Sequence, residues 1–138
     1  MKKVLILILA LFTVNVFASC DRPVTFSDLP SKAQQFINQH FNGIEVISVV
    51  ADDGHYEVYL SDGTELEFDR KGEWRDVDCK RKAVPAAIIP TNITNYVKSK
   101  FPSNFIVRIE KKHVGYEVEL DNDLDLRFDK NGNFQYVD

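Results

Sequence analysis

The chain has 138 residues, two cysteines and a formal net charge of −4, and 28% of its residues are charged and 44% hydrophobic. This composition is that of a globular protein, and it excludes a long disordered chain and a disulfide-rich scaffold. The acidic balance argues against a nucleic-acid-binding protein, which usually carries a basic face.

Residues 1–18 have the pattern of a signal peptide. Two lysines precede an apolar run over 4–16, which is too short to span a bilayer as a helix. The small residues that follow predict cleavage between Ala18 and Ser19. We therefore expect a periplasmic or secreted protein with no transmembrane segment in the mature chain.

The alternative to simple secretion is a lipid anchor at Cys20. Phe17 departs from the lipoprotein pattern, in which leucine is usual at that position. In an oxidising compartment Cys20 could instead form a disulfide with Cys79, closing a loop of 59 residues that would add roughly 4 kcal/mol of stability. The sequence leaves anchor and disulfide open, because it does not place the two Cβ atoms.

The remainder of the chain contains an internal repeat at an offset of sixty residues. Residues 29–78 align without a gap on residues 89–138, and twelve of the fifty positions are identical, where chance would give about three. The predicted organisation is a signal peptide, an N-terminal segment, a first repeat, a linker and a second repeat, over 1–18, 19–28, 29–78, 79–88 and 89–138.

Each repeat is predicted to begin with a helix. Pro30 and Pro90 suit the first helical position, where a missing N–H costs nothing. Apolar residues then recur at helical spacing and form one stripe on each helix. The residues of these stripes are Leu29, Ala33, Phe36, Ile37 and Phe41, then Ile89, Ile93, Tyr96, Val97 and Phe101. We expect Phe36 and Tyr96 to lie on the buried sides of the two helices.

Four strands follow each helix. The runs over 44–50 and 104–110 are β-branched, and the next segments alternate apolar and polar residues, as in antiparallel strands with one face in water. Hairpin turns are predicted at Asp-Gly, Asn-Gly and Lys-Gly pairs. The last strand, Trp74 to Val77 in the first repeat, has an apolar spacing of three, which predicts a bulge or an early end.

The predicted fold class is therefore α+β, with two tandem units that each pack one helix on a four-stranded antiparallel meander sheet. Fifty residues form a marginal core. For this reason the two units are expected either to share a core or to join their sheets edge to edge.

The doubled pattern resembles the PepSY-like family of secreted bacterial proteins, which is grouped with the beta-lactamase inhibitor protein. The matching residues are Leu29-Pro30, Phe41, Tyr56-Glu57-Val58, Phe68-Asp69, Gly72, Trp74, Val77-Asp78-Cys79, Val84-Pro85, Pro90, Phe101-Pro102, Tyr116-Glu117-Val118 and Phe128-Asp129. The resemblance covers nearly all of residues 23–138. It implies helix-on-sheet units in tandem and an envelope location typical of Bacteroidetes-like bacteria, and it implies no catalytic residues.

Catalytic and metal-binding motifs are absent from the sequence. The three histidines have no ligand spacing with another histidine or with a cysteine, and there is no serine elbow, phosphate loop or dinucleotide fingerprint. The alternating carboxylates of 121–125 resemble the start of a calcium loop, but Leu126 and Gly132 stand where its glycine and closing glutamate belong. We expect no enzyme activity and no cofactor.

The outer sheet face is the candidate binding surface. Strand alternation directs Glu57, Tyr59, Glu65 and Glu67 away from the helix in the first repeat, and Glu117, Glu119, Asp125 and Arg127 in the second. The first repeat carries a net charge of −7 and the second −1. Tyr59 and Trp74 are candidate aromatic anchors, although Trp74 could belong to the core. The alternative is a merely solvated face.

The function expected from these features is that of a non-catalytic extracytoplasmic protein-binding module, acting as an inhibitor or regulator of an envelope enzyme. Its expected partner is an unidentified protein or cationic peptide of the cell envelope, attracted by the acidic face. The alternative is a small-molecule or metal-binding envelope protein.

Overall fold

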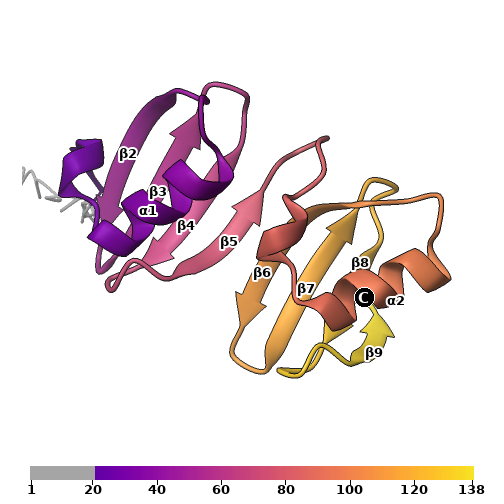
Figure 1. The fold of residues 1–138 in the computed structure, drawn as a ribbon. Helices are drawn as coiled ribbons and strands as arrows, with labels where there is room; N and C mark the ends of the chain where they lie inside the picture. The colour runs from indigo at the N-terminus through magenta and orange to yellow at the C-terminus, as the bar shows by residue number, and fades with distance from the viewer. Residues whose placement is uncertain (1–20) are drawn as a thin grey trace, which may run out of the picture.

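Strand order in the sheet is the same as strand order in the sequence. The computed structural model describes residues 21–138, and in this part of the chain nine antiparallel strands form one continuous sheet (Figure 1). The strands are β1 (Arg22–Val24), β2 (Val46–Asp52), β3 (His55–Leu60), β4 (Glu65–Asp69), β5 (Trp74–Asp78), β6 (Ile106–Lys112), β7 (Gly115–Leu120), β8 (Asp125–Phe128) and β9 (Phe134–Val137). The signal peptide and the predicted cleavage site between Ala18 and Ser19 lie outside the described residues.

Two α-helices accompany the sheet in residues 21–138: α1 (Ser31–His40) and α2 (Thr91–Lys100). Each begins directly after a proline, with Pro30 and Pro90 at the N-cap rather than at the first helical position. A single 3₁₀ turn precedes each helix, η1 (Phe26–Asp28) and η2 (Ala86–Ile88). No helix in the described part of the chain is long and apolar enough to cross a membrane.

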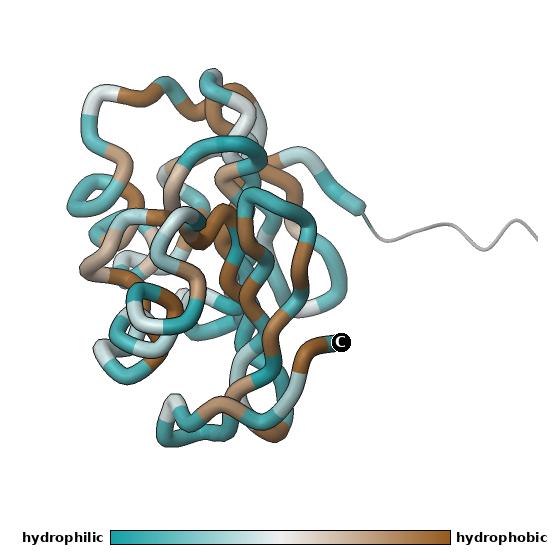
Figure 2. The backbone as a smooth tube through the Cα atoms, turned by 90° about the vertical axis from the view of Figure 1, so that its right-hand side faces the viewer, coloured by the Kyte–Doolittle hydropathy of each residue, from teal (hydrophilic) through white to brown (hydrophobic). Residues whose placement is uncertain are grey.

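Both helices lie on the same face of the sheet, so the hydrophobic core is a single layer between helices and strands (Figure 2). The predicted helical stripes face this layer: Ala33 and Ile37 on α1, and Ile93 and Val97 on α2, are buried. The apolar strand residues beneath them are almost fully buried as well, and include Val58, Leu66, Val77, Ile109, Val118 and Leu126. The helix stripes and strand alternation read from the sequence therefore describe the core correctly.

Phe36 and Tyr96 occupy equivalent positions at the rim of the core. Each is half-buried, packs against core residues and meets a strand phenylalanine edge-on, with ring centroids 5.5 Å apart. The partner is Phe68 for Phe36 and Phe128 for Tyr96. The two helices are thus anchored to the sheet by the same aromatic contact, although neither ring is fully enclosed.

The prediction of two units, each with a four-stranded sheet of its own, is wrong. β5 pairs with β6, and the register joins Asp76 to Glu110, Val77 to Ile109 and Asp78 to Arg108. Strands that end two separate sheets would leave a row of backbone N–H and C=O groups unpaired at each edge. Their pairing satisfies these groups and places two fully buried residues, Val77 and Ile109, in one core.

Two further features of the sheet are the first strand, β1, and a bulge in β5. β1, in a segment for which no strand was predicted, pairs with β2 and begins the sheet. The bulge expected in the last strand of the first half is confirmed, because the register shifts where β4 meets β5, beside Trp74. The same shift recurs where β8 meets β9. Glycines at the predicted hairpin turns, such as Gly54, have positive φ.

Candidate binding face

The face of the sheet opposite the helices carries two rows of charged side chains. Residues that are neighbours in register lie on adjacent strands, roughly 4.8 Å apart. One row runs through Glu57, Glu67, Asp76, Glu110, Glu117 and Arg127. The other runs through Tyr59, Glu65, Asp78, Arg108, Glu119 and Asp125. Carboxylates therefore face carboxylates across most strand boundaries on this face.

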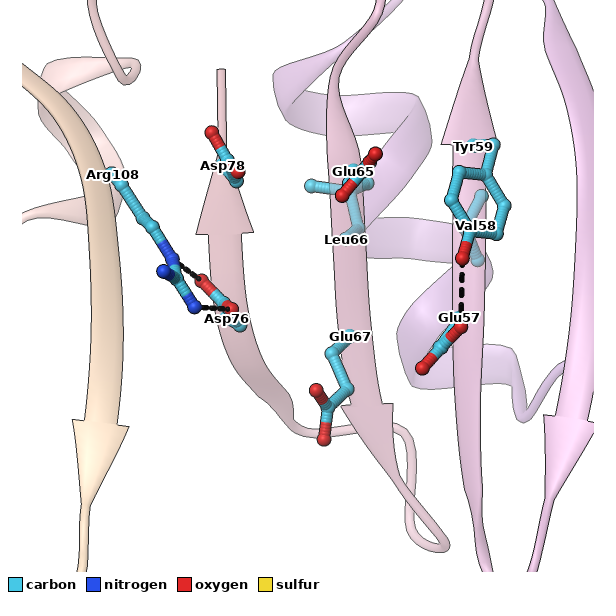
Figure 3. A pocket seen from close by; sticks show the side chains of 9 residues that line it. All are labelled: Glu57, Val58, Tyr59, Glu65, Leu66, Glu67, Asp76, Asp78 and Arg108. Carbon is cyan, nitrogen blue, oxygen red and sulfur yellow. Dashed lines mark hydrogen bonds and ion pairs between the residues drawn. The ribbon is translucent and has the colours of Figure 1, made fainter. Parts of the chain in front are cut away.

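A groove of about 280 Å³ lies where these rows cross β3, β4, β5 and β6 (Figure 3). Val58 and Leu66 contribute to its floor, and the remaining lining residues are polar. Five of them are the carboxylates Glu57, Glu65, Glu67, Asp76 and Asp78, and the other two are Tyr59 and the cation Arg108. We call this set the acidic groove. Its charge is negative even after Arg108 is counted.

One wall of the acidic groove is formed by Tyr59 and Glu57 on β3. The Tyr59 hydroxyl donates a hydrogen bond to Glu57 Oε2 at 2.8 Å. This bond, with burial and the nearby carboxylates, raises the pKa of Tyr59 to about 12. The bond orients the Glu57 carboxylate and fixes the tyrosine ring beside it (Figure 3).

The opposite wall is formed by a two-point ion pair across the β5–β6 junction. Arg108 Nε lies 3.0 Å from Asp76 Oδ1, and Arg108 Nη2 lies 2.6 Å from Asp76 Oδ2. A second carboxylate, Glu110, accepts a longer contact from Arg108 Nη2 at 3.4 Å. The hydrogen bonds to Asp76 raise the pKa of Arg108 above its usual value. The Arg108 guanidinium is therefore held against Asp76 and forms part of the groove wall.

Glu67 lies between these walls, and its side chain has no hydrogen bond or ion pair with any other described residue (Figure 3). Burial raises its pKa, and the carboxylates of Asp76, Glu57 and Glu110 add to this effect, whereas His55 opposes it. Glu67 is therefore a half-buried carboxylate without a cation of its own at the centre of the groove.

Glu65 and Asp78 at the upper end share one cation. Lys80 Nζ lies 3.0 Å from Glu65 Oε2 and 2.9 Å from Asp78 Oδ2. These contacts raise the pKa of Lys80. All three side chains are partly exposed, so water weakens the pairing, and a cation from outside the chain could compete with Lys80 for the two carboxylates.

The second half of the face is closer to neutral. Glu117 forms an ion pair with Arg127, which also reaches Asp138 at 2.7 Å. Lys112 lies 2.8 Å from Glu110 and 3.9 Å from Glu117. Lys112 and Arg127 thus neutralise part of the negative charge on the second half of the face. The negative potential is therefore concentrated over β3, β4 and β5.

Four of the residues singled out from the sequence, Glu57, Tyr59, Glu65 and Glu67, meet in the acidic groove. Trp74 is not with them. It lies on the helix side, where its ring stacks near Phe36 at 6.4 Å between centroids and Lys111 Nζ sits 4.0 Å from its centroid. The bulge at the start of β5 explains the position of Trp74. It breaks the alternation of side chains that would otherwise place Trp74 on the outer face.

Asp76, Asp78 and Arg108 were missed by the sequence reading. The alternation of Asp76 and Asp78 around buried Val77 is the signal that could have placed both on the outer face. No such signal exists for Arg108, because it joins the groove only through the pairing of β5 with β6.

Catalytic and metal-ligating groups do not converge on this face. Within residues 21–138 no three histidine, cysteine, aspartate or glutamate side chains are arranged to hold a metal ion. Cys79 is buried, and burial raises the pKa of its thiol to about 11, so it is a poor nucleophile at neutral pH. The disulfide predicted with Cys20 remains a prediction, because Cys20 lies outside the described residues.

Comparison with known proteins shows what the chain is similar to. The family model described as "Putative beta-lactamase-inhibitor-like, PepSY-like" matches residues 54–136. A crystal structure from Bacteroides thetaiotaomicron, described as a "putative calcium-regulated periplasmic protein", is 39% identical, with a TM-score of 0.82 over 86% of this chain and 96% of that one.

Two crystal structures from Bacteroides vulgatus, both described as periplasmic proteins, are each 36% identical to the chain. One has a TM-score of 0.83 and covers 86% of this chain and 98% of its own, and the other has a TM-score of 0.84 and covers 88% and 98%. No curated protein matches. The family match and these likenesses agree with the resemblance read from the sequence, and the chain belongs to the PepSY-like, beta-lactamase-inhibitor-like family.

Proposed function

We propose that the protein is a non-catalytic, extracytoplasmic binding module that docks a cationic protein or peptide on its acidic groove, and that it inhibits or regulates an envelope enzyme. The observation that carries this proposal is the acidic groove on the sheet face opposite the helices. Five carboxylates line it, and its one arginine, Arg108, is already paired with Asp76. The inhibitor-like family and the periplasmic relatives support it.

The chemistry of the groove favours a lysine or arginine side chain as the group that enters it. Glu67 has no cation among the described residues, and Asp76 and Glu57 flank it in register. A guanidinium or ammonium group placed there would offset the repulsion among these carboxylates. The surrounding negative potential would mainly increase the association rate, and salt would reduce that increase.

The test is capture of partners from an envelope extract by the wild-type protein and by the triple variant Glu57→Gln, Glu65→Gln, Glu67→Gln. The captured protein should bind the triple variant more slowly and with less dependence on salt. A matched control removes three exposed carboxylates outside the groove, through Glu45→Gln, Asp53→Asn and Asp123→Asn. Equal binding by the wild type and the groove variant would refute the proposal, as would equal losses in the groove and control variants.

The location is part of the same proposal. We place the protein in the periplasm, as its relatives are described, with the lipid anchor at Cys20 as the alternative. The intact mass of the exported protein distinguishes the two. A mass that begins at Ser19 supports release, and an acyl adduct on Cys20 supports the anchor and excludes a disulfide with Cys79.

A second candidate is cation binding, favoured by the relative that is described as calcium-regulated. Residues 21–138 contain no preformed metal-ligand group, so calcium would bind weakly and through the same acidic face. A thermal-shift titration with calcium and with zinc tests this. A saturable shift that the groove variant loses supports it, and no shift argues against it.

A further inference from the structure

A basic pocket lies at the opposite end of the β5–β6 junction from Lys80. Its volume is about 320 Å³, and it is lined by Arg75, Lys111, Lys112, Gly115, Tyr116 and Lys130. No carboxylate lines it, although acidic residues outnumber basic residues in the chain by 21 to 17. We propose that this basic pocket binds a phosphate group.

The lining residues come from four segments that the fold brings together. Arg75 lies on β5, Lys111 and Lys112 end β6, Tyr116 is near the start of β7, and Lys130 lies in the turn between β8 and β9. Lys111 and Tyr116 are neighbours in register. Because Arg75 reaches the others only through the pairing of β5 with β6, the pocket exists only in the joined sheet.

The internal repeat shows that the fold itself does not require these cations. In the other repeat, the counterpart of Lys111 is Ala51 and that of Lys112 is Asp52. The counterpart of Arg75 is Gln135. Only Lys130 has a basic counterpart. The first half forms the same hairpin without lysines, so the cationic set belongs to this one place rather than to the repeat.

The electrostatics of the pocket favour a multiply charged anion. Burial lowers the pKa of Lys111, and the charge of Arg75 contributes in the same direction, whereas the carboxylates of Glu73 and Asp69 act against it. The Lys111 ammonium group also lies over the Trp74 ring, with Nζ 4.0 Å from the ring centroid. The charge of Lys112 is offset by Glu110 and Glu117, but Arg75 and Lys130 are exposed and have no ion pair with any described residue. A phosphate group would accept hydrogen bonds from several of these donors and relieve their mutual repulsion.

The experiment titrates inorganic phosphate into the isotope-labelled protein at constant ionic strength and follows backbone amide signals. Saturable changes should cluster in the β6–β7 hairpin and the β8–β9 turn. The variant Arg75→Gln, Lys130→Gln should bind about ten-fold more weakly, because it removes two exposed charge contacts. The control Lys98→Gln, Lys100→Gln removes two exposed charges at the end of α2 and should bind like the wild type.

A second measurement separates a free phosphate from a lipid headgroup. Cosedimentation with vesicles of phosphatidylglycerol and phosphatidylcholine is compared with vesicles of phosphatidylcholine alone. Binding to the anionic vesicles that the pocket variant loses assigns the phosphate to a lipid, and saturable inorganic-phosphate binding without vesicle binding assigns it to a soluble compound. Absence of both, or equal losses in the pocket and control variants, would overturn the proposal.

Discussion

Arg108 on β6 donates two hydrogen bonds, of 3.0 and 2.6 Å, to Asp76 on β5. This side-chain bridge spans the junction where the two halves of the sheet meet. The backbone pairing of these strands covers three residue pairs. The side-chain bridge therefore contributes both to the joining of the halves and to one wall of the acidic groove.

Replacing Arg108 by glutamine should lower the free energy of unfolding by about 1–2 kcal/mol, because Asp76, Asp78 and Glu110 then repel one another without a shared cation. Urea unfolding of a double-mutant cycle with Asp76→Asn measures the coupling. The double variant should lose less than the sum of the single losses, by about 1 kcal/mol. Strict additivity would show that the bridge does not stabilise the junction.

Phe36→Ala should destabilise the first half by about 2–4 kcal/mol, less than a fully buried phenylalanine, since the ring is only half-buried. The loss comes from its packing against Phe68 and Trp74. Gln35→Ala on the exposed side of α1 serves as the control and should change stability by no more than about 0.5 kcal/mol. A loss below about 1 kcal/mol for Phe36→Ala would contradict the assigned role of this aromatic contact.

Gly115→Ala should be among the most damaging single substitutions in the described chain. Gly115 has a φ of +142°, and a Cβ atom there would lie 2.0 Å from the Phe128 carbonyl oxygen. We expect a loss above about 3 kcal/mol. Gly63 also has a positive φ, of +90°, but has open space around it, so Gly63→Ala should cost only about 1 kcal/mol. Comparing the thermal unfolding of the two variants separates the effect of the steric clash at Gly115 from that of a positive φ alone. Similar losses of stability in both variants would refute the steric explanation.

Glu67→Gln should change how stability depends on pH. Burial raises the pKa of Glu67 above its ordinary value of 4.5, so the folded state favours the protonated carboxyl group. Its contribution to stability is present below 4.5 and is lost as the pH rises through the higher folded-state pKa. At neutral pH the glutamine variant should therefore be slightly more stable than the wild type. Urea unfolding between pH 4 and 7 checks this, and a difference between the proteins that stays constant over that range would contradict it.

Outward orientation on the strands could be read from the sequence because it depends on local geometry. Successive side chains of a strand alternate between faces, and this alternation alone places Glu57, Tyr59, Glu65 and Glu67 on the face where the groove lies. The rule fails for Trp74, which lies beside a bulge where one extra residue breaks the alternation. The groove residues on β3 and β4, and Asp76 and Asp78 on β5, therefore follow from strand alternation, whereas Arg108 on β6 does not.

Local sequence patterns by themselves determined the helix stripes, the hairpin turns and the face of most strand residues, because each depends on neighbours a few residues away. Only the tertiary structure decided that β5 pairs with β6 and β1 with β2. These pairings join segments that are distant along the chain, and their free energy comes from burying Val77 and Ile109 and from satisfying backbone groups at two edges, which no local pattern encodes. The Arg108–Asp76 bridge and the basic pocket are consequences of that junction.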